Sequence, residues 1–233
     1  MSERAVREAL ERTQAWRAMS RAFSPPQDLA AIREDLAALR GRSRDALDDA
    51  LAAALDALVH EDADDLVAAH AALFGPGGAV PPRESAWADA RIVAPVELAD
   101  MRGFLRAFGL EEKGELADHI ATECEVASAL ALKEAWALAQ GWDEQARIAR
   151  EAYERLLGDH LMRWLPRFAQ RVRQARASAF HAAVAQALAL LVASESIRIG
   201  LPPGAETPGV PARDWEEALA CGGCGTEGEA PAA

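Results

Sequence analysis

Residues 118–141 read DHIATECEVASALALKEAWALAQG, a run in which alanine and leucine recur and neither proline nor glycine occurs before the last position. Alanine and leucine are strong helix formers, and glycine is common just beyond a helix end. The stretch therefore predicts one long helix that begins at about Asp118 and is ended by Gly141. We expect the Asp118 side chain to cap this helix, with His119 and Glu123 one turn apart in its first turn.

The rest of the first 200 residues carries similar helix signals. Alanine makes up about a quarter of the chain, aromatic residues only 6%, and no sustained alternation of apolar and polar residues indicates a strand. Apolar residues recur at three- and four-residue spacing, and the predicted helices cover about 6–23, 29–39, 43–58 with Ser43 as cap, 62–74, 98–108, 118–140, 143–164, a short one opened by Pro166, and 178–199. We expect an all-α fold, a single compact bundle of about eight to ten helices over residues 1–200.

Two stretches break the helical pattern. Residues 75–87, GPGGAVPPRESAW, hold three glycines and three prolines, which a regular helix does not tolerate. They predict one long internal loop. Residues 201–233 are again rich in proline and glycine and contain CGGC, so we predict a mobile C-terminal tail.

Charge narrows the classes of partner. The chain has 25 basic and 37 acidic residues, a formal net charge of −12, and would repel polyphosphate and anionic lipid. This argues against nucleic acid and favours a cationic partner. The N-terminus shows no secretory signal, so we expect a cytoplasmic protein. The uncharged stretch 177–194 is better explained as a buried, alanine-rich helix than as an integral membrane segment.

Spacing excludes the common enzyme centres. None of the five histidines has a glutamate three residues before it, as di-iron bundles need, and no two histidines lie four apart, as in helical zinc proteases. The sequence also lacks a phosphate loop ending in Gly-Lys-Ser/Thr and a Gly-x-Ser-x-Gly elbow. We therefore expect no catalytic residues and no enzyme.

Two places retain candidate metal chemistry. Asp118, His119 and Glu123 form a conceivable but weak ligand set, and the alternative is a capping aspartate beside a partly buried histidine. Cys221 and Cys224 supply half of the ligands of a tetrahedral zinc site or of an iron–sulfur site, and a dimer could supply the other half. The pair could instead form a dithiol switch. An inert tail is the alternative there. Three cysteines cannot form a disulfide framework and suit a reducing compartment.

Several pieces, taken in order, resemble the TorD/DmsD family, whose relatives include the NarJ-type proteins. The resemblance spans about residues 5–197. Its pieces are RTQAWRAMSRAFSPP at 12–26, LFG at 73–75 leading to PRES at 82–85, DHI at 118–120 followed by Glu123, and HL at 160–161 with WLPRF at 164–168. The chain departs from the family pattern at Ala117, usually proline, at Arg83, commonly aromatic, and in its Cys-x-x-Cys tail.

The resemblance implies an all-helical cytoplasmic chaperone for molybdenum-containing redox enzymes, without turnover of its own and with no required cofactor. Its partner would be the catalytic subunit of a molybdenum oxidoreductase, whose N-terminal twin-arginine leader it would hold until molybdopterin is inserted. A homodimer would be in keeping with the family. The alternative function is a helical metal-binding protein or metal-dependent enzyme. The candidate peptide-binding residues are Phe74, Glu84, Ser85, Trp87, Asp118, His119 and Glu123, with the three carboxylates as arginine partners.

Overall fold

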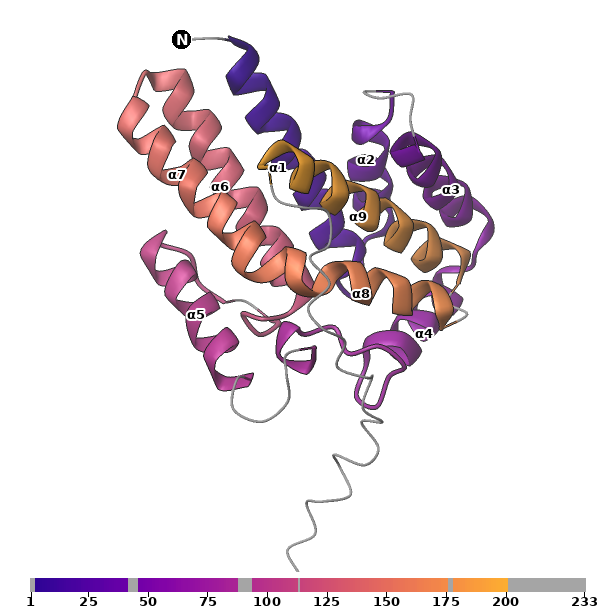
Figure 1. Ribbon diagram of the computed structural model, residues 1–233. Coiled ribbons are helices and arrows are strands. Elements are labelled where there is room, and N and C mark those ends of the chain that lie inside the picture. The colour runs from indigo at the N-terminus through magenta and orange to yellow at the C-terminus, as the bar shows by residue number, and fades with distance from the viewer. Residues whose placement is uncertain (1–2, 42–45, 88–93, 113, 176–177, 201–233) are drawn as a thin grey trace, which may run out of the picture.

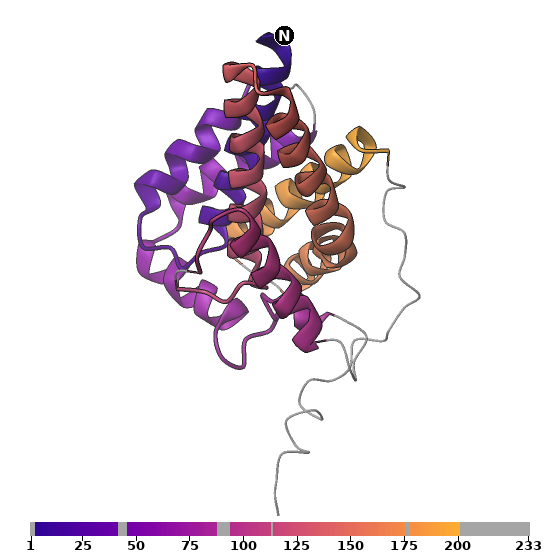
Figure 2. The ribbon, with the colours of Figure 1, turned by 90° about the vertical axis from the view of Figure 1, so that its left-hand side faces the viewer.

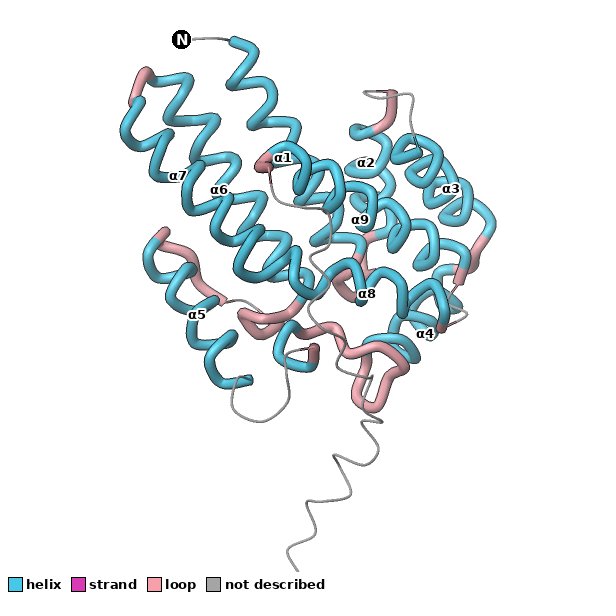
Figure 3. Tube along the Cα trace, in the orientation of Figure 1, coloured by secondary structure: helices cyan, strands magenta, loops and turns pink. Residues whose placement is uncertain are grey.

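The computed structural model describes residues 3–41, 46–87, 94–112, 114–175 and 178–200, and within these ranges it is helical, with no strand (Figure 1, Figure 3). The elements are α1 Glu3–Ala22, α2 Leu29–Leu39, α3 Ala46–His60, α4 Ala63–Phe74, the 3-10 turn η1 Glu84–Ala86, α5 Ala94–Ala107, α6 Ile120–Gln140, α7 Asp143–Leu156, the π turn η2 Leu157–Leu161, α8 Met162–Gln174 and α9 Ala179–Arg198. The predicted all-α class is confirmed. The predicted cap Ser43 and the tail 201–233, with Cys221 and Cys224, lie outside the described residues.

Most of the stretch 118–141 forms helix α6, and two thirds of the residues of this helix are buried. Helix α6 packs against α1 on one side and against α7 on another, while α9 packs against α3 and α8 (Figure 1, Figure 2). Small side chains such as Ala127, Ala131 and Ala135 are buried along α6. Because the distance between helix axes depends on the side chains at the contact, these alanines let its neighbours approach closely.

Helix α9 is long and apolar enough, by length and composition alone, to cross a membrane. In the bundle, however, 56% of its most apolar window is buried, against α3 and α8 among others. Ser178 caps its first turn by accepting a hydrogen bond from the His181 backbone N–H. These features are those of a core helix, which is what the alanine-rich stretch 177–194 predicts.

The prediction of one helix over 143–164 with a new one opened by Pro166 is wrong. The chain changes at Leu157, where α7 passes into the π turn η2, and Pro166 lies inside α8. A π turn inserts one extra residue into a helix, often at a functional site, and no apolar spacing announces it. In this turn the His160 side chain is buried, with 2% of the residue exposed.

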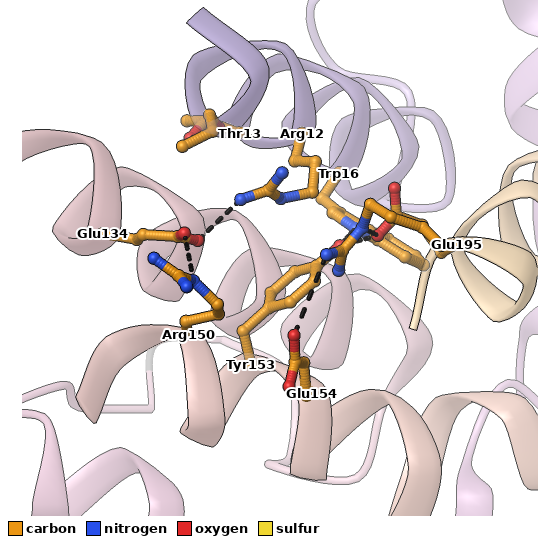
Figure 4. A network of polar contacts seen from close by, with 10 residues as sticks. Arg12, Thr13, Trp16, Glu134, Arg150, Tyr153, Glu154 and Glu195 are labelled. Atoms are coloured by element: carbon orange, nitrogen blue, oxygen red, sulfur yellow. Dashed lines mark hydrogen bonds and ion pairs between the residues drawn. The ribbon is translucent and has the colours of Figure 1, made fainter. Parts of the chain in front are cut away.

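A buried carboxylate ties α1, α6 and α7 together (Figure 4). Glu134 on α6 accepts a hydrogen bond from Arg12 Nη2 at 2.6 Å and another from Arg150 Nε at 2.9 Å. The side chains of Arg12 and Glu134 are only 11% and 4% exposed. A buried ion is tolerated when its partners satisfy it, and here two guanidinium groups share one carboxylate.

A second chain of hydrogen bonds links α1, α7 and α9 (Figure 4). Trp16 Nε1 donates to the Tyr153 hydroxyl at 2.6 Å, and this hydroxyl donates to Glu195 Oε2 at 2.9 Å. Arg198 Nε donates to the same oxygen at 2.8 Å. Burial, and then the charge of Glu195, raise the pKa of Tyr153 well above its usual value. The hydroxyl therefore keeps its proton and acts as a structural relay.

We predict that Glu134→Ala lowers the free energy of unfolding by about 3–5 kcal/mol, because it leaves buried Arg12 without its counter-ion. Glu134→Gln retains oxygen and shape and should cost less. Urea denaturation followed by circular dichroism measures both. The matched control is Glu144→Ala, which removes a solvent-exposed partner of Arg147 and should change little. Equal losses for the glutamates at 134 and 144 would contradict the structural role of the network.

Candidate functional site

Two main-chain hydrogen bonds fasten the Gly/Pro loop onto the start of α6. The Ile120 N–H donates to the Pro82 carbonyl and the Glu84 N–H donates to the Asp118 carbonyl, each at 2.9 Å. Arg83 and His119 form the isolated antiparallel bridge between these bonds. The PRES and DHI segments, far apart in sequence, are therefore side by side. A backbone pairing of this kind places the side chains of both segments in one small volume.

The loop reaches this position through a close backbone approach at its start. The Val80 N–H donates to the Leu73 carbonyl at 2.9 Å, which folds the chain back over the end of α4. A Cβ atom at Gly78 would lie 2.5 Å from that same carbonyl oxygen, so only glycine fits there. The glycines of the predicted loop are thus part of its geometry, and the turn ends in η1.

The prediction that Asp118 caps α6 is wrong, and His119 takes that role. Asp118 Oδ1 accepts from Arg83 Nε at 3.1 Å, while His119 Nδ1 accepts from the Ala121 N–H at 3.2 Å and the His119 backbone is extended. The Asp118 side chain is drawn away because the paired loop presents a guanidinium beside it. Burial lowers the pKa of His119, against the influence of nearby carboxylates, which suits a neutral ring whose Nδ1 accepts a hydrogen bond.

Three carboxyl groups gather in the interior behind this pairing. Asp118 and Glu123 are 0% exposed and Glu84 is 3% exposed. Glu123 Oε2 accepts from Trp164 Nε1 at 3.0 Å. Burial, followed by the charge of Glu84, raises the pKa of Glu123 well above its usual value. Glu123 therefore holds a proton more tightly than a free carboxyl, since two buried carboxylates in contact do not both ionise.

His160 connects this cluster to α5. Its Nδ1 lies 2.8 Å from Glu84 Oε2, and its Nε2 lies 3.2 Å from Asp100 Oδ2 without the geometry of a hydrogen bond. The Phe104 ring meets the imidazole edge to face, with centroids 5.6 Å apart. Burial opposes the charged form of His160, but the Glu84 and Asp100 carboxylates outweigh it and raise its pKa. The cationic form of the His160 ring is therefore favoured more than in a free histidine.

The cluster has more acceptors than donors. Asp118 Oδ2 is buried and has no donor, and Glu97 Oε2 on α5 shares this condition, whereas Glu123 can share its own proton with Glu84. Buried polar atoms are normally hydrogen-bonded, and the exceptions call for an explanation. A guanidinium group carries five N–H donors and is the side chain best matched to such a set.

A row of aromatic rings runs from the acid cluster across the bundle. Trp87 lies 6.3 Å from Trp164 and 6.2 Å from Phe168, centroid to centroid, and Phe168 stacks on Phe74 at 5.8 Å. Trp87 Nε1 donates to the Pro81 carbonyl at 2.9 Å. The predicted apolar walls Phe74 and Trp87 thus belong to one row, but Phe74 is 8% exposed and belongs to the core rather than to an open wall.

The structure brings most of the predicted site residues together, but in a closed arrangement. The hydrogen-bonded contact between the Gly/Pro loop and the start of α6 brings together Glu84, Asp118, His119 and Glu123. Ser85 lies half-buried in η1. The described residues contain no group of three ligands that could hold a metal ion. The metal-site alternative at Asp118, His119 and Glu123 is wrong, because these side chains turn to Arg83, the Ala121 N–H and Trp164.

A surface hollow of about 520 Å³ lies elsewhere. Residues of α1, α3 and α9 form most of its wall, and its lining includes Arg12, Leu51, Leu191 and Arg198. None of the predicted site residues lines this hollow. The hollow therefore offers no entrance to the carboxylate cluster.

Sequence reasoning missed three members of the site: His160, Trp164 and Arg83. His160, Trp164 and Phe168 follow one another at four-residue spacing, which places them on one helix face, and this spacing was the available signal. No spacing pattern in the sequence marked Arg83 as part of the site. Its pairing with Asp118 depends on a backbone contact between segments 35 residues apart.

Two further histidines lie near the far end of the aromatic row. The rings of His70 and His181 are 5.8 Å apart, and each meets Phe74 edge to face. Burial, and next the charge of a neighbouring histidine, lower the pKa of each to about 4. His70 Nδ1 is buried without a partner. Both rings are therefore neutral in the folded protein near pH 7.

We predict that His70 and His181 make the folded protein less stable as the pH drops from about 6.5 towards 4, because in this window the unfolded chain binds protons at these histidines that the folded chain refuses, whereas the raised pKa values of His160 and Glu123 act in the opposite direction. His70→Leu removes one of these sites and should flatten the loss. The measurement is the free energy of unfolding in urea at pH 7.5, 6.5 and 5.5. Variant and wild type should run parallel above pH 7. Parallel curves down to pH 5.5 would show that His70 is not held neutral.

Comparison with known proteins identifies the family of the chain. No curated protein matches the chain. Residues 40–170, more than half of the chain, match the family described as nitrate reductase delta subunit. The matched region contains the Gly/Pro loop, the three carboxylates and the aromatic row from Phe74 to Phe168. The chain therefore belongs to the nitrate reductase delta subunit family, which comprises NarJ/TorD-type chaperones of molybdoenzyme maturation.

Proposed function

We propose that this protein is a cytoplasmic, client-specific chaperone that binds the N-terminal leader, or the cofactor-free form, of the catalytic subunit of a molybdenum oxidoreductase. It holds this client until molybdopterin has been inserted, and it catalyses no reaction of its own. Membership of a family of maturation chaperones supports the general role. The recognition of a leader is argued from the carboxylate cluster.

The deficit of donors around Glu84, Asp118 and Glu123 is the observation that carries this proposal. A twin-arginine leader offers guanidinium groups followed by an apolar stretch. One guanidinium could donate to Asp118 Oδ2, which has no donor in the free protein, and to Glu123 once that carboxyl is ionised. The proton held by Glu123 would then leave, because a positive charge beside a carboxyl favours its ionised form.

The arginines alone do not supply enough affinity. A micromolar complex needs about 8 kcal/mol, whereas an exposed arginine–carboxylate pair contributes about 0.2–1 kcal/mol. Burial of a leucine-sized side chain contributes about 1.5–3 kcal/mol. The apolar stretch of the leader therefore has to be buried too, and in the aromatic row beside Glu123 only Trp87 is partly exposed, while Trp164, Phe168 and Phe74 are buried.

We predict that Asp118→Asn weakens binding of a synthetic twin-arginine leader by about 10- to 150-fold, since a hydrogen bond to a charged group contributes about 1.5–3 kcal/mol. Titration calorimetry measures the affinity, and circular dichroism verifies the helical fold. The control is Asp64→Asn, an exposed carboxylate in the first turn of α4, which should bind as wild type does. Unchanged affinity in Asp118→Asn would make this residue purely structural.

Capture of the client tests the wider proposal. The tagged full-length chain, isolated from its native cytoplasm, should carry a molybdoenzyme catalytic subunit that still has its N-terminal leader. Mass spectrometry identifies the partner and its first residues. Recovery of the chain with no molybdoenzyme subunit under conditions in which that enzyme is produced would refute the client assignment.

The cysteine pair and the homodimer remain proposals. Cys221 and Cys224 would hold zinc or an iron–sulfur centre only with ligands from elsewhere, such as a second copy of the chain. Elemental analysis of the protein with and without residues 221–233 separates a bound metal from an inert tail.

A further inference from the structure

We infer that α5 is a displaceable cover that occupies the docking surface of the client, and that an arginine-bearing amphipathic segment of the client binds by taking its place. This inference rests on the proposed function. It starts from a mismatch: the carboxylates best suited to bind arginine are sealed in the free protein. Glu84, Asp118 and Glu123 are at most 3% exposed, so some part of the bundle has to move before a guanidinium reaches them.

Helix α5 has the pattern of a bound amphipathic segment. One face is apolar and directed inward, with Met101 and Leu105 buried. The opposite face exposes Arg102 and Arg106. A twin-arginine leader also presents arginines beside an apolar stretch, but the arginines of α5 face outward, with Arg102 paired to Glu112, so what α5 shares with the leader in covering this surface is its apolar side chains. The partly buried members of the inward face are Leu98, Phe104 and Phe108.

The attachment of α5 is lighter than that of most other helices. Its broadest contact is with the three-residue turn η1, whereas α1, α3, α6, α7, α8 and α9 each pack broadly against another α-helix. Its described polar tie to the body runs from Asp100 to His160, at 3.2 Å and without hydrogen-bond geometry, and the Asp100 side chain is 61% exposed. The Phe104 ring adds one edge-to-face contact with the same histidine.

A buried charge makes the closed position less stable still. Glu97, in the first turn of α5, is 4% exposed, and its Oε2 has no donor. A buried acceptor without a donor opposes burial, so opening of α5 relieves a cost that the closed state carries. Release of α5 also uncovers His160 and Glu84, the side chains beneath Phe104 and Asp100.

Replacement of α5 by a client segment would preserve the favourable burial of apolar side chains. A client segment with apolar residues at helical spacing would bury a comparable area where α5 lay, and its arginines would bring a donor to Asp118 Oδ2, which α5 leaves unsatisfied, and a positive charge beside Glu123. A ligand shifts a conformational equilibrium only by its differential affinity for the two states. Here the difference is the set of donors that α5 does not provide.

The first test needs no client. Hydrogen exchange of the full-length free protein, read by mass spectrometry, should show α5 amides exchanging at least tenfold faster than those of α6. Phe104→Ala and Asp100→Asn should speed exchange in α5 further and leave α6 unchanged. The control is Gly103→Ala on the outer face of α5, where an added Cβ meets no atom within 4 Å and should not speed exchange. Protection of α5 equal to that of α6 would overturn the inference.

The second test uses a synthetic twin-arginine leader and calorimetry. Phe104→Ala and Asp100→Asn should bind it about three- to tenfold more tightly than wild type, because the open form is populated more often. Gly103→Ala should not bind more tightly. Weaker binding by both inner-face variants would make α5 a permanent wall of the site and overturn the inference. If no variant and no wild type binds a leader, the proposed function fails, and the exchange measurement alone decides whether α5 opens.

Discussion

The pairing of Pro82–Glu84 with Asp118–Ile120 is the constraint on which the candidate site depends. Its two main-chain hydrogen bonds place a loop and a helix start in contact, and they fix Glu84, Asp118 and Glu123 in one interior volume. Without this pairing, Arg83 would not reach Asp118. The Gly/Pro loop, the His119 cap and the buried acid cluster are therefore consequences of a single backbone contact.

Comparison of the buried carboxylates within the bundle separates structure from function. Glu134 has two guanidinium partners, and Glu195 has a tyrosine and an arginine. Glu123 has an indole N–H and the neighbouring Glu84 carboxyl, and no arginine pairs with it among the described contacts. The structural carboxylates are thus paired with arginines, including Asp35, whose Oδ2 also has no hydrogen-bond donor but lies against Arg21, whereas Glu123 lies against another acid. Strongly perturbed groups of this kind concentrate at functional sites.

The sequence predicted the helices well because helices depend on local signals. The spacing of apolar residues, Gly141 and Asp62 all lie within a few residues of the structure they determine. The candidate site was predictable only in part. The segments that carry it could be recognised, but the burial of its carboxylates depends on Trp164 and on α5, which are distant in sequence. The π turn at Leu157–Leu161, which carries His160 into the interior, likewise has no local signature.

A covered site has a consequence for selectivity. If the open form is a small fraction of the population, the apparent affinity of every ligand is lowered by that same fraction. A cationic peptide without an apolar stretch gains only the arginine–carboxylate pairs, about 0.2–1 kcal/mol each when exposed. This gain does not compensate for the loss of the apolar contacts of α5. A leader with both features recovers those contacts, at about 1.5–3 kcal/mol for each large apolar side chain it buries. An acidic surface attracts many cations, but α5 restricts access to the buried carboxylates to segments that are both basic and apolar.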